Sequence, residues 1–158
     1  MKRNENRDRF AFATALLVLV AGLHPAPASG GDAIYGKVTA VKSAEVVVLD
    51  YGHGQYDIRL AGIVAPKEGP LAERARELVT KLVLGQVGRA RFEYRAKNGE
   101  MVSRLFTGDP GVDVGLELMR AGLAQRLQGY DYKYGELSAA EREAREAKRG
   151  VWAAAQPK

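Results

Sequence analysis

The chain has 158 residues, no cysteine, two histidines and a formal net charge of +5. This length suits a single domain, and the lack of cysteine excludes disulfides and a catalytic thiol. Two histidines, of which His24 falls in a leader segment and His53 in a turn-like sequence, are too few for zinc or phosphodiesterase sites built on paired imidazoles.

Residues 1–30 have the pattern of a signal peptide. A charged start precedes the uncharged run Phe10–Leu23, and residues 24–30 (HPAPASG) supply the small residues that suit cleavage near residues 28–30. The run of 14 residues is shorter than the ~20 that a membrane span needs, so cleavage is favoured over an uncleaved membrane anchor. We therefore expect an exported protein, periplasmic or secreted, with a mature part that is not inserted in a membrane.

The charge of that mature part permits contact with a polyanion without requiring it. Removing residues 1–28 leaves 20 Lys+Arg against 17 Asp+Glu, a net charge of +3. This mildly basic balance is not that of a dedicated DNA-wrapping protein. A nucleic acid and a protein are therefore both candidate partners.

Hydrophobic periodicity predicts five strands and three helices in residues 31–158, which we expect to form one domain. The expected order is strands at 33–39, 45–49 and 56–63, a helix at 71–84, strands at 87–94 and 101–107, and helices at 115–124 and 137–148. Pro70 opens the first helix and Gly85 stops it, whereas Asn98-Gly99 indicates a hairpin turn. This order predicts an α+β domain built on a small β-barrel.

Four segments carry a family resemblance. They are Gly36–Val41 (GKVTAV), Ile58–Lys67 (IRLAGIVAPK), Asp113–Ala124 (DVGLELMRAGLA) and a C-terminal segment. In the C-terminal segment, Ala140-Glu141 and Ala144-Arg145 precede Gly150-Val-Trp152. In order and spacing they resemble the opening strand, the I-R-L-x-G-I-D-A-P-E run, the D-V-N-x-x-L-V-x-x-G-L-A helix and the A-E-x-x-A-R…G-L-W close of the staphylococcal nuclease (thermonuclease-like) family. The resemblance covers about residues 34–152 and implies a five-stranded OB-fold barrel capped by about three helices.

The resemblance also indicates where the family's functional groups fall. Arg59 keeps the arginine that grips phosphate. The other positions hold different residues. Glu45 and Val64 stand in place of the two metal-binding aspartates, and Lys67 stands in place of the glutamate base. Glu100 replaces the second arginine, and Gln125 and Leu127 replace the tyrosines that stack on the nucleotide. Glu45 is therefore the only candidate metal ligand among these positions, and Ca²⁺ is the ion that an active site of this family would need.

Two of these replacements reverse charge in complementary directions, which predicts a salt-bridge cluster in place of the catalytic site. We expect Arg59 to pair with Glu45 and Lys67 with Glu100, because a lone charge in a partly enclosed cleft is costly. An alternative is a slip of one residue that makes Glu68 the base. That slip leaves the missing metal ligand and the missing arginine unexplained.

Two further groups are candidates for binding. Tyr130, Tyr132 and Tyr134 alternate in the tract GYDYKYG, a pattern suited to base stacking, although a loop that buries one or two of the rings over the barrel is the favoured interpretation. Arg89 and Arg91 share one face of a strand and either present cations to a ligand or simply face solvent.

The sequence thus predicts an exported thermonuclease-like protein that has lost phosphodiester hydrolysis. Without a complete metal site it needs no cofactor, and it acts as a binding module for a nucleic acid, another polyanion or a protein. The alternative is a calcium-dependent nuclease with an altered site that uses Glu45, Arg59 and Glu68 on DNA or RNA.

Overall fold

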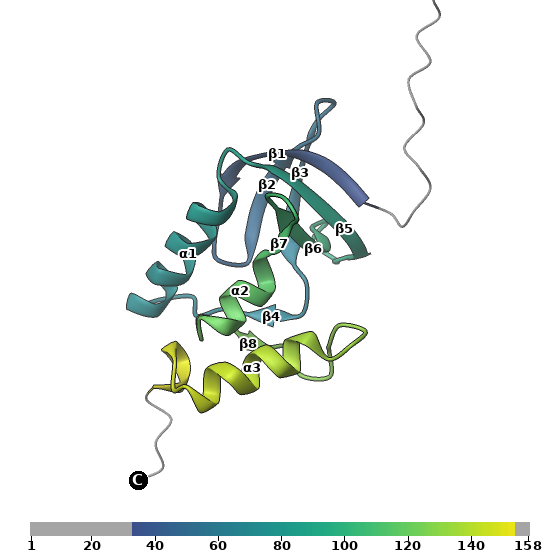
Figure 1. Cartoon of the computed structure of the whole chain (residues 1–158). Coiled ribbons are helices and arrows are strands. Elements are labelled where there is room, and N and C mark those ends of the chain that lie inside the picture. The colour runs from purple at the N-terminus through teal and green to yellow at the C-terminus, as the bar shows by residue number, and fades with distance from the viewer. Residues whose placement is uncertain (1–32, 154–158) are drawn as a thin grey trace, which may run out of the picture.

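A closed barrel of five strands forms the centre of the computed structural model, which describes residues 33–153. The predicted signal peptide therefore lies outside the described residues. The strands are β1 (Ala33–Val41), β2 (Val46–Asp50), β3 (Gln55–Leu60), β5 (Val87–Arg95) and β6 (Met101–Thr107). Antiparallel pairing joins β1 to β2 and β5, β2 to β3, and β5 to β6, while parallel pairing of β3 with β6 closes the barrel (Figure 1). The expected α+β barrel is confirmed.

The barrel interior is apolar because strand residues alternate between the inside and the outside. Val38, Leu49, Ile58 and Leu105 are fully buried, one from each of four strands. A large share of the stabilisation comes from removing such side chains from water, at about 1.5–3 kcal/mol for each fully buried one.

Three helices cap the barrel, as predicted. They are α1 (Pro70–Val83), α2 (Val114–Arg120) and α3 (Glu136–Glu146), followed by a short 3-10 helix, η1 (Gly150–Trp152). The short helix α2 lies between the barrel and α3 (Figure 1). Across residues 33–153, no helix is long and apolar enough to cross a membrane.

The third strand is shorter than predicted. It ends at Leu60 rather than Ile63, because Gly62 adopts a φ of 74° that breaks the extended chain. The chain then enters β4 (Ile63–Val64), which pairs with β8 (Gln125–Arg126) in a separate two-stranded sheet. The degenerate family positions 64 and 125 thus become direct neighbours.

Helices α2 and α3 both differ at their ends from the predicted ranges. Helix α2 starts one residue early because the carboxylate of Asp113 accepts a hydrogen bond from the Leu116 N–H, 3.1 Å away. The same helix stops at Arg120, before Gly122 with its φ of 67°. Helix α3 ends at Glu146, two residues early, and Lys148 follows with a φ of 52°. Asp113 also belongs to a two-residue edge strand, β7 (Val112–Asp113), that pairs with β6.

Candidate functional site

Arg59 lies between two carboxylates at one end of the barrel. Strand β3 carries the arginine, the loop before β2 carries Glu45, and the β5–β6 hairpin carries Glu100. The Arg59 Nη1 is 2.6 Å from an oxygen of Glu45, and its Nε is 2.6 Å from an oxygen of Glu100. The two glutamate side chains are about 15% exposed and Arg59 is 34% exposed. One cation thus pairs with two anions, and the trio carries a net charge of −1.

This arrangement confirms one of the two predicted ion pairs and contradicts the other. Arg59 does pair with Glu45, but Glu100 pairs with Arg59 and not with Lys67. Lys67 is exposed and makes no ion pair within the described part of the chain. The physical reason is that one guanidinium has several N–H donors in a planar fork and can bind two carboxylates at once. Glu100 therefore needs no second cation as a partner.

Hydrogen bonding shifts the pKa values of this cluster in opposite directions. The hydrogen bond from Arg59 lowers the pKa of Glu100, assisted by a bond from Asn98 and opposed by partial burial. The bond to Glu100 likewise raises the pKa of Arg59. Both groups therefore stay charged at neutral pH, and charge-assisted hydrogen bonds join them.

The donor set around Glu45 does not match what a calcium ion takes. One Glu45 oxygen accepts from Arg59, and the other accepts from the Ala65 N–H at 2.7 Å. Calcium binds six to eight oxygens, commonly with several carboxylates, whereas the second metal position is the apolar Val64, 41% exposed. In residues 33–153, no group of three or more His, Cys, Asp or Glu side chains is placed to hold a metal.

A groove of about 590 Å³ lies beside this cluster. Glu45 and Arg59 form part of its lining, together with Lys67, Glu68 and Arg76. Glu68 is exposed and has no hydrogen-bond or ion-pair partner among the described residues. Its assignment as a base stays a prediction.

The chain matches a known protein family. A family model described as staphylococcal nuclease homologue matches residues 57–154. The chain belongs to this family. It is 30% identical over 127 residues to a probable staphylococcal-like nuclease of Oryza sativa subsp. japonica, a match that covers 80% of the chain and 36% of that relative. It is also 28% identical over 125 residues to an uncharacterized endonuclease of Escherichia coli O157:H7, covering 78% of the chain and 80% of that relative. The chain thus spans about a third of the rice protein and most of the bacterial one.

In this staphylococcal nuclease homologue, the positions of the nucleotide-stacking tyrosines offer no rings. Gln125 lies on β8 and is exposed, and Leu127 is 40% exposed in the following loop. The Leu127 N–H donates to the carbonyl of Gly62, which ties this loop to the turn after β3. These residues have a backbone role that requires no particular side chain.

The tyrosine tract folds over the barrel, as the favoured interpretation predicted. Tyr132 is buried and its hydroxyl donates to the Ala61 carbonyl at 3.2 Å, whereas Tyr130 is half-buried. Desolvation raises the pKa of Tyr130 to about 12 and raises that of Tyr132 as well. Tyr134 differs, because it is 79% exposed. Only this third ring is open to a ligand.

Sequence reasoning missed the ion pair that fixes the tyrosine tract. The guanidinium of Arg104 lies 2.9 Å from the carboxylate of Asp113 and 3.6 Å from that of Glu136. Its carbon also lies 3.7 Å from the centre of the Tyr132 ring. The signal available in the sequence was weak, because Arg104 sits in an otherwise ordinary alternating strand.

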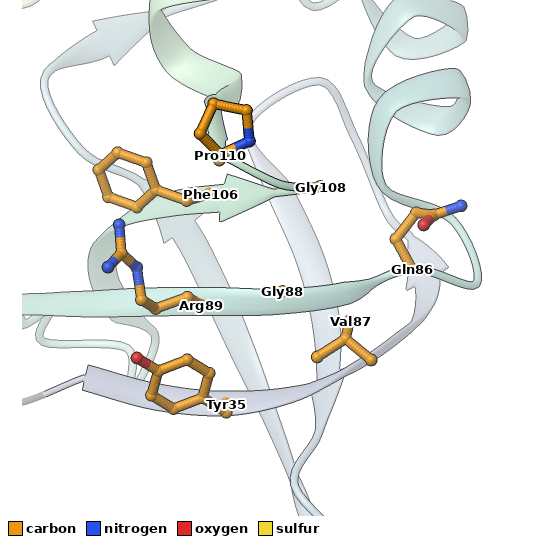
Figure 2. Close-up of a pocket in the computed structure, with 9 residues that line it drawn as sticks. Tyr35, Gln86, Val87, Gly88, Arg89, Phe106, Gly108 and Pro110 are labelled. Atoms are coloured by element: carbon orange, nitrogen blue, oxygen red, sulfur yellow. The ribbon is translucent and has the colours of Figure 1, made fainter. Parts of the chain in front are cut away.

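Arg89 and Arg91 are both exposed on the outside of β5, on the shared strand face that their spacing predicted. Figure 2 shows what the sequence did not reveal, namely that Arg89 lies between Tyr35 of β1 and Phe106 of β6. The alternation of each strand was visible in the sequence. The register that aligns three distant strands was not.

Proposed function

We propose that this staphylococcal nuclease homologue does not hydrolyse phosphodiesters at the family position and acts as a binding module. The observation that supports this most directly is the double pairing of Arg59 with Glu45 and Glu100 at 2.6 Å each. The residue that would grip phosphate is already satisfied by two anions. A nucleic acid is the leading candidate ligand and a protein is the competing one.

Electrostatics supports the same conclusion. A phosphodiester that approaches Arg59 meets a cluster with net charge −1, in a partly enclosed position where charge interactions exceed their strength in water. To bind there it must displace a carboxylate from a short, charge-assisted hydrogen bond. Family-type hydrolysis also needs a hard cation and a base, and Val64 and Lys67 supply neither.

A nuclease assay tests the proposal. The protein, expressed from the full sequence, is incubated with single- and double-stranded DNA and with RNA, in calcium or in chelator. We expect no calcium-dependent cleavage, and an Arg59→Ala variant prepared identically should give the same background. Cleavage that requires calcium and disappears in Arg59→Ala contradicts the proposal.

The alternative is a calcium-dependent nuclease with a rearranged site, which the names of the rice and E. coli relatives favour. It requires Glu45 to release Arg59 and bind the ion, and an exposed carboxylate such as Glu68 to serve as base. If the wild-type protein cleaves, Glu68→Gln should abolish cleavage while Glu73→Gln, another exposed acid in the groove, leaves it intact.

We also propose that residues 1–28 direct export, with cleavage near residues 28–30, on the sequence pattern alone. N-terminal sequencing of the protein from fractionated cells tests this. A mature N-terminus close to residue 29 or 31 in the exported fraction is expected. An intact N-terminus in the membrane fraction indicates an uncleaved anchor instead.

A further inference from the structure

An aromatic–arginine–aromatic row lies on the outside of the barrel, on strands β1, β5 and β6. Strand pairing sets Tyr35 opposite Arg89 and Arg89 opposite Phe106 (Figure 2). The Arg89 guanidinium carbon lies 4.7 Å from the centre of the Phe106 ring, and Tyr35 is 61% exposed. The three residues help to line a hollow of about 450 Å³. Phe106 is half-buried, and the Arg104 guanidinium carbon also lies 5.2 Å from the centre of its ring. The exposed members of the row are therefore the Tyr35 ring and the Arg89 guanidinium.

A second hollow, of about 480 Å³, continues this surface toward the tyrosine tract. Phe106 lines both hollows, and Arg91, Lys133 and Tyr134 line the second. We call this surface the outer face; it consists of Tyr35, Arg89, Arg91, Phe106, Lys133 and Tyr134, which line the two hollows, and of Lys37, which is exposed two residues after Tyr35 on the same face of β1. It shares no residue with the groove beside Arg59.

The charges of the outer face are not neutralised by the protein. Lys37, Arg89, Arg91 and Lys133 form no ion pair with any residue in 33–153, and all four are exposed. The nearby acids are mostly engaged: Asp113 and Glu136 pair with Arg104, and Asp131 accepts from the backbone of Tyr132, Leu137 and Ser138 and from the Ser138 hydroxyl. Glu93 is the one lining acid without a partner in the described chain.

We propose that the outer face binds single-stranded nucleic acid, with bases stacked on Tyr35 and Tyr134 and phosphates held by the cations that have no ion-pair partner. Exposed rings interleaved with cations are the combination that single strands bind, because every base has a π-face and every nucleotide a charge. A duplex keeps its base faces stacked against each other, so these rings would find no partner. The proposal rests on the proposed binding function and gives it a site.

The outer face should not distinguish single-stranded DNA from single-stranded RNA. Rings and cations contact base faces and phosphates, and the outer face contains no side chain that we assign to the sugar. Single-stranded DNA and RNA of the same sequence should therefore bind alike, and both more tightly than the duplex.

Fluorescence anisotropy with labelled oligonucleotides of about 15 nucleotides tests this. The protein is expressed from the full sequence, purified as the host processes it, and kept in chelator so that cleavage cannot interfere. Tyr35→Ala should raise the Kd for single strands about tenfold, and Tyr35→Phe, which keeps the ring, should leave it unchanged. The double variant Arg89→Ala/Arg91→Ala should flatten the slope of log K against log salt by about 1.4, because each phosphate that is no longer neutralised reduces the slope by ~0.7.

Matched control variants distinguish binding at the outer face from binding in the groove beside Arg59. Lys67→Ala/Arg76→Ala removes two exposed cations from the groove beside Arg59 and should not change binding. Glu93→Gln removes the opposing charge of the outer face and should tighten binding about twofold. Thermal unfolding of each variant verifies that it is folded.

The outer-face proposal is overturned if no single strand binds, if the groove variant weakens binding as much as the outer-face variants, or if binding is insensitive to salt. These outcomes are distinct from failure of the proposed function, which requires calcium-dependent cleavage. A protein that cleaves in calcium and binds through Tyr35 in chelator would contradict the first proposal and support the second.

Discussion

Two regions of the barrel use arginine in opposite ways. Arg59 lies between Glu45 and Glu100, with both contacts at 2.6 Å. Arg89 and Arg91 lie on the outer face, and neither has an ion-pair partner in residues 33–153. A cation held by two carboxylates is neutralised within the protein, whereas an exposed cation without an ion-pair partner keeps its charge for a ligand. The retained family arginine is therefore already paired within the protein, whereas two arginines outside the family motif are not paired with any residue in 33–153.

The largest expected effect comes from removing the paired arginine. Arg59→Ala leaves two partly buried carboxylates facing each other without a cation, so we expect a loss of about 2–3 kcal/mol in the free energy of unfolding. Urea denaturation measures it. Arg89→Ala is the matched control, because it removes an exposed, unpaired arginine and should change stability by less than about 0.5 kcal/mol.

A triple variant tests whether the stability lost in Arg59→Ala comes from the two carboxylates that are left without a cation. Glu45→Gln/Arg59→Met/Glu100→Gln removes all three charges and should recover most of the stability lost in Arg59→Ala. If Arg59→Ala costs no more than Arg89→Ala, the two regions do not differ as the structure indicates.

A smaller effect, dependent on pH, is expected for Glu100→Gln. The hydrogen bond from Arg59 lowers the folded-state pKa of Glu100, so its contribution is complete above the unfolded pKa of about 4.3 and is lost as pH falls through the folded value. At pH 7 we expect the variant to be about 1–2 kcal/mol less stable than the wild type. The difference should shrink as the pH falls below about 4.

Urea denaturation at pH 7 and pH 3.5 makes this comparison, with Glu93→Gln as control. Glu93 is exposed on the neighbouring strand and unpaired within the described chain, so its removal should give no comparable pH dependence. A constant difference between Glu100→Gln and wild type at the two pH values would show that ionisation of Glu100 does not contribute to stability.

The barrel and its helices could be predicted because their signals are local and repeated. Alternating or continuous β-branched apolar residues marked the five strands, and Pro70 and Gly85 bracketed α1. The pairing of β4 with β8 could not be predicted, because each strand has two residues and the partners are more than 60 positions apart. Such short, distant pairings depend on tertiary packing and leave no periodic pattern.

Predicting the site was only partly successful, for a related reason. Substitutions at family positions indicated that the charges would compensate, and Arg59–Glu45 does form. Charge alone did not say which cation reaches Glu100, since Arg59 and Lys67 are both nearby in the motif. The outer face was harder, because Tyr35, Arg89 and Phe106 are aligned only by strand register.

The smallest effect is expected for Lys67, which the sequence placed in an ion pair and the structure does not. Lys67→Ala should change the free energy of unfolding by less than about 0.5 kcal/mol, because an exposed lysine without a partner contributes little. Urea denaturation of Lys67→Ala, Glu100→Gln and the double variant gives their coupling energy. A coupling near zero agrees with Glu100 being held by Arg59 alone. A coupling above about 1 kcal/mol would mean that Lys67 competes with Arg59 for Glu100 in solution, which would leave Arg59 held by Glu45 alone.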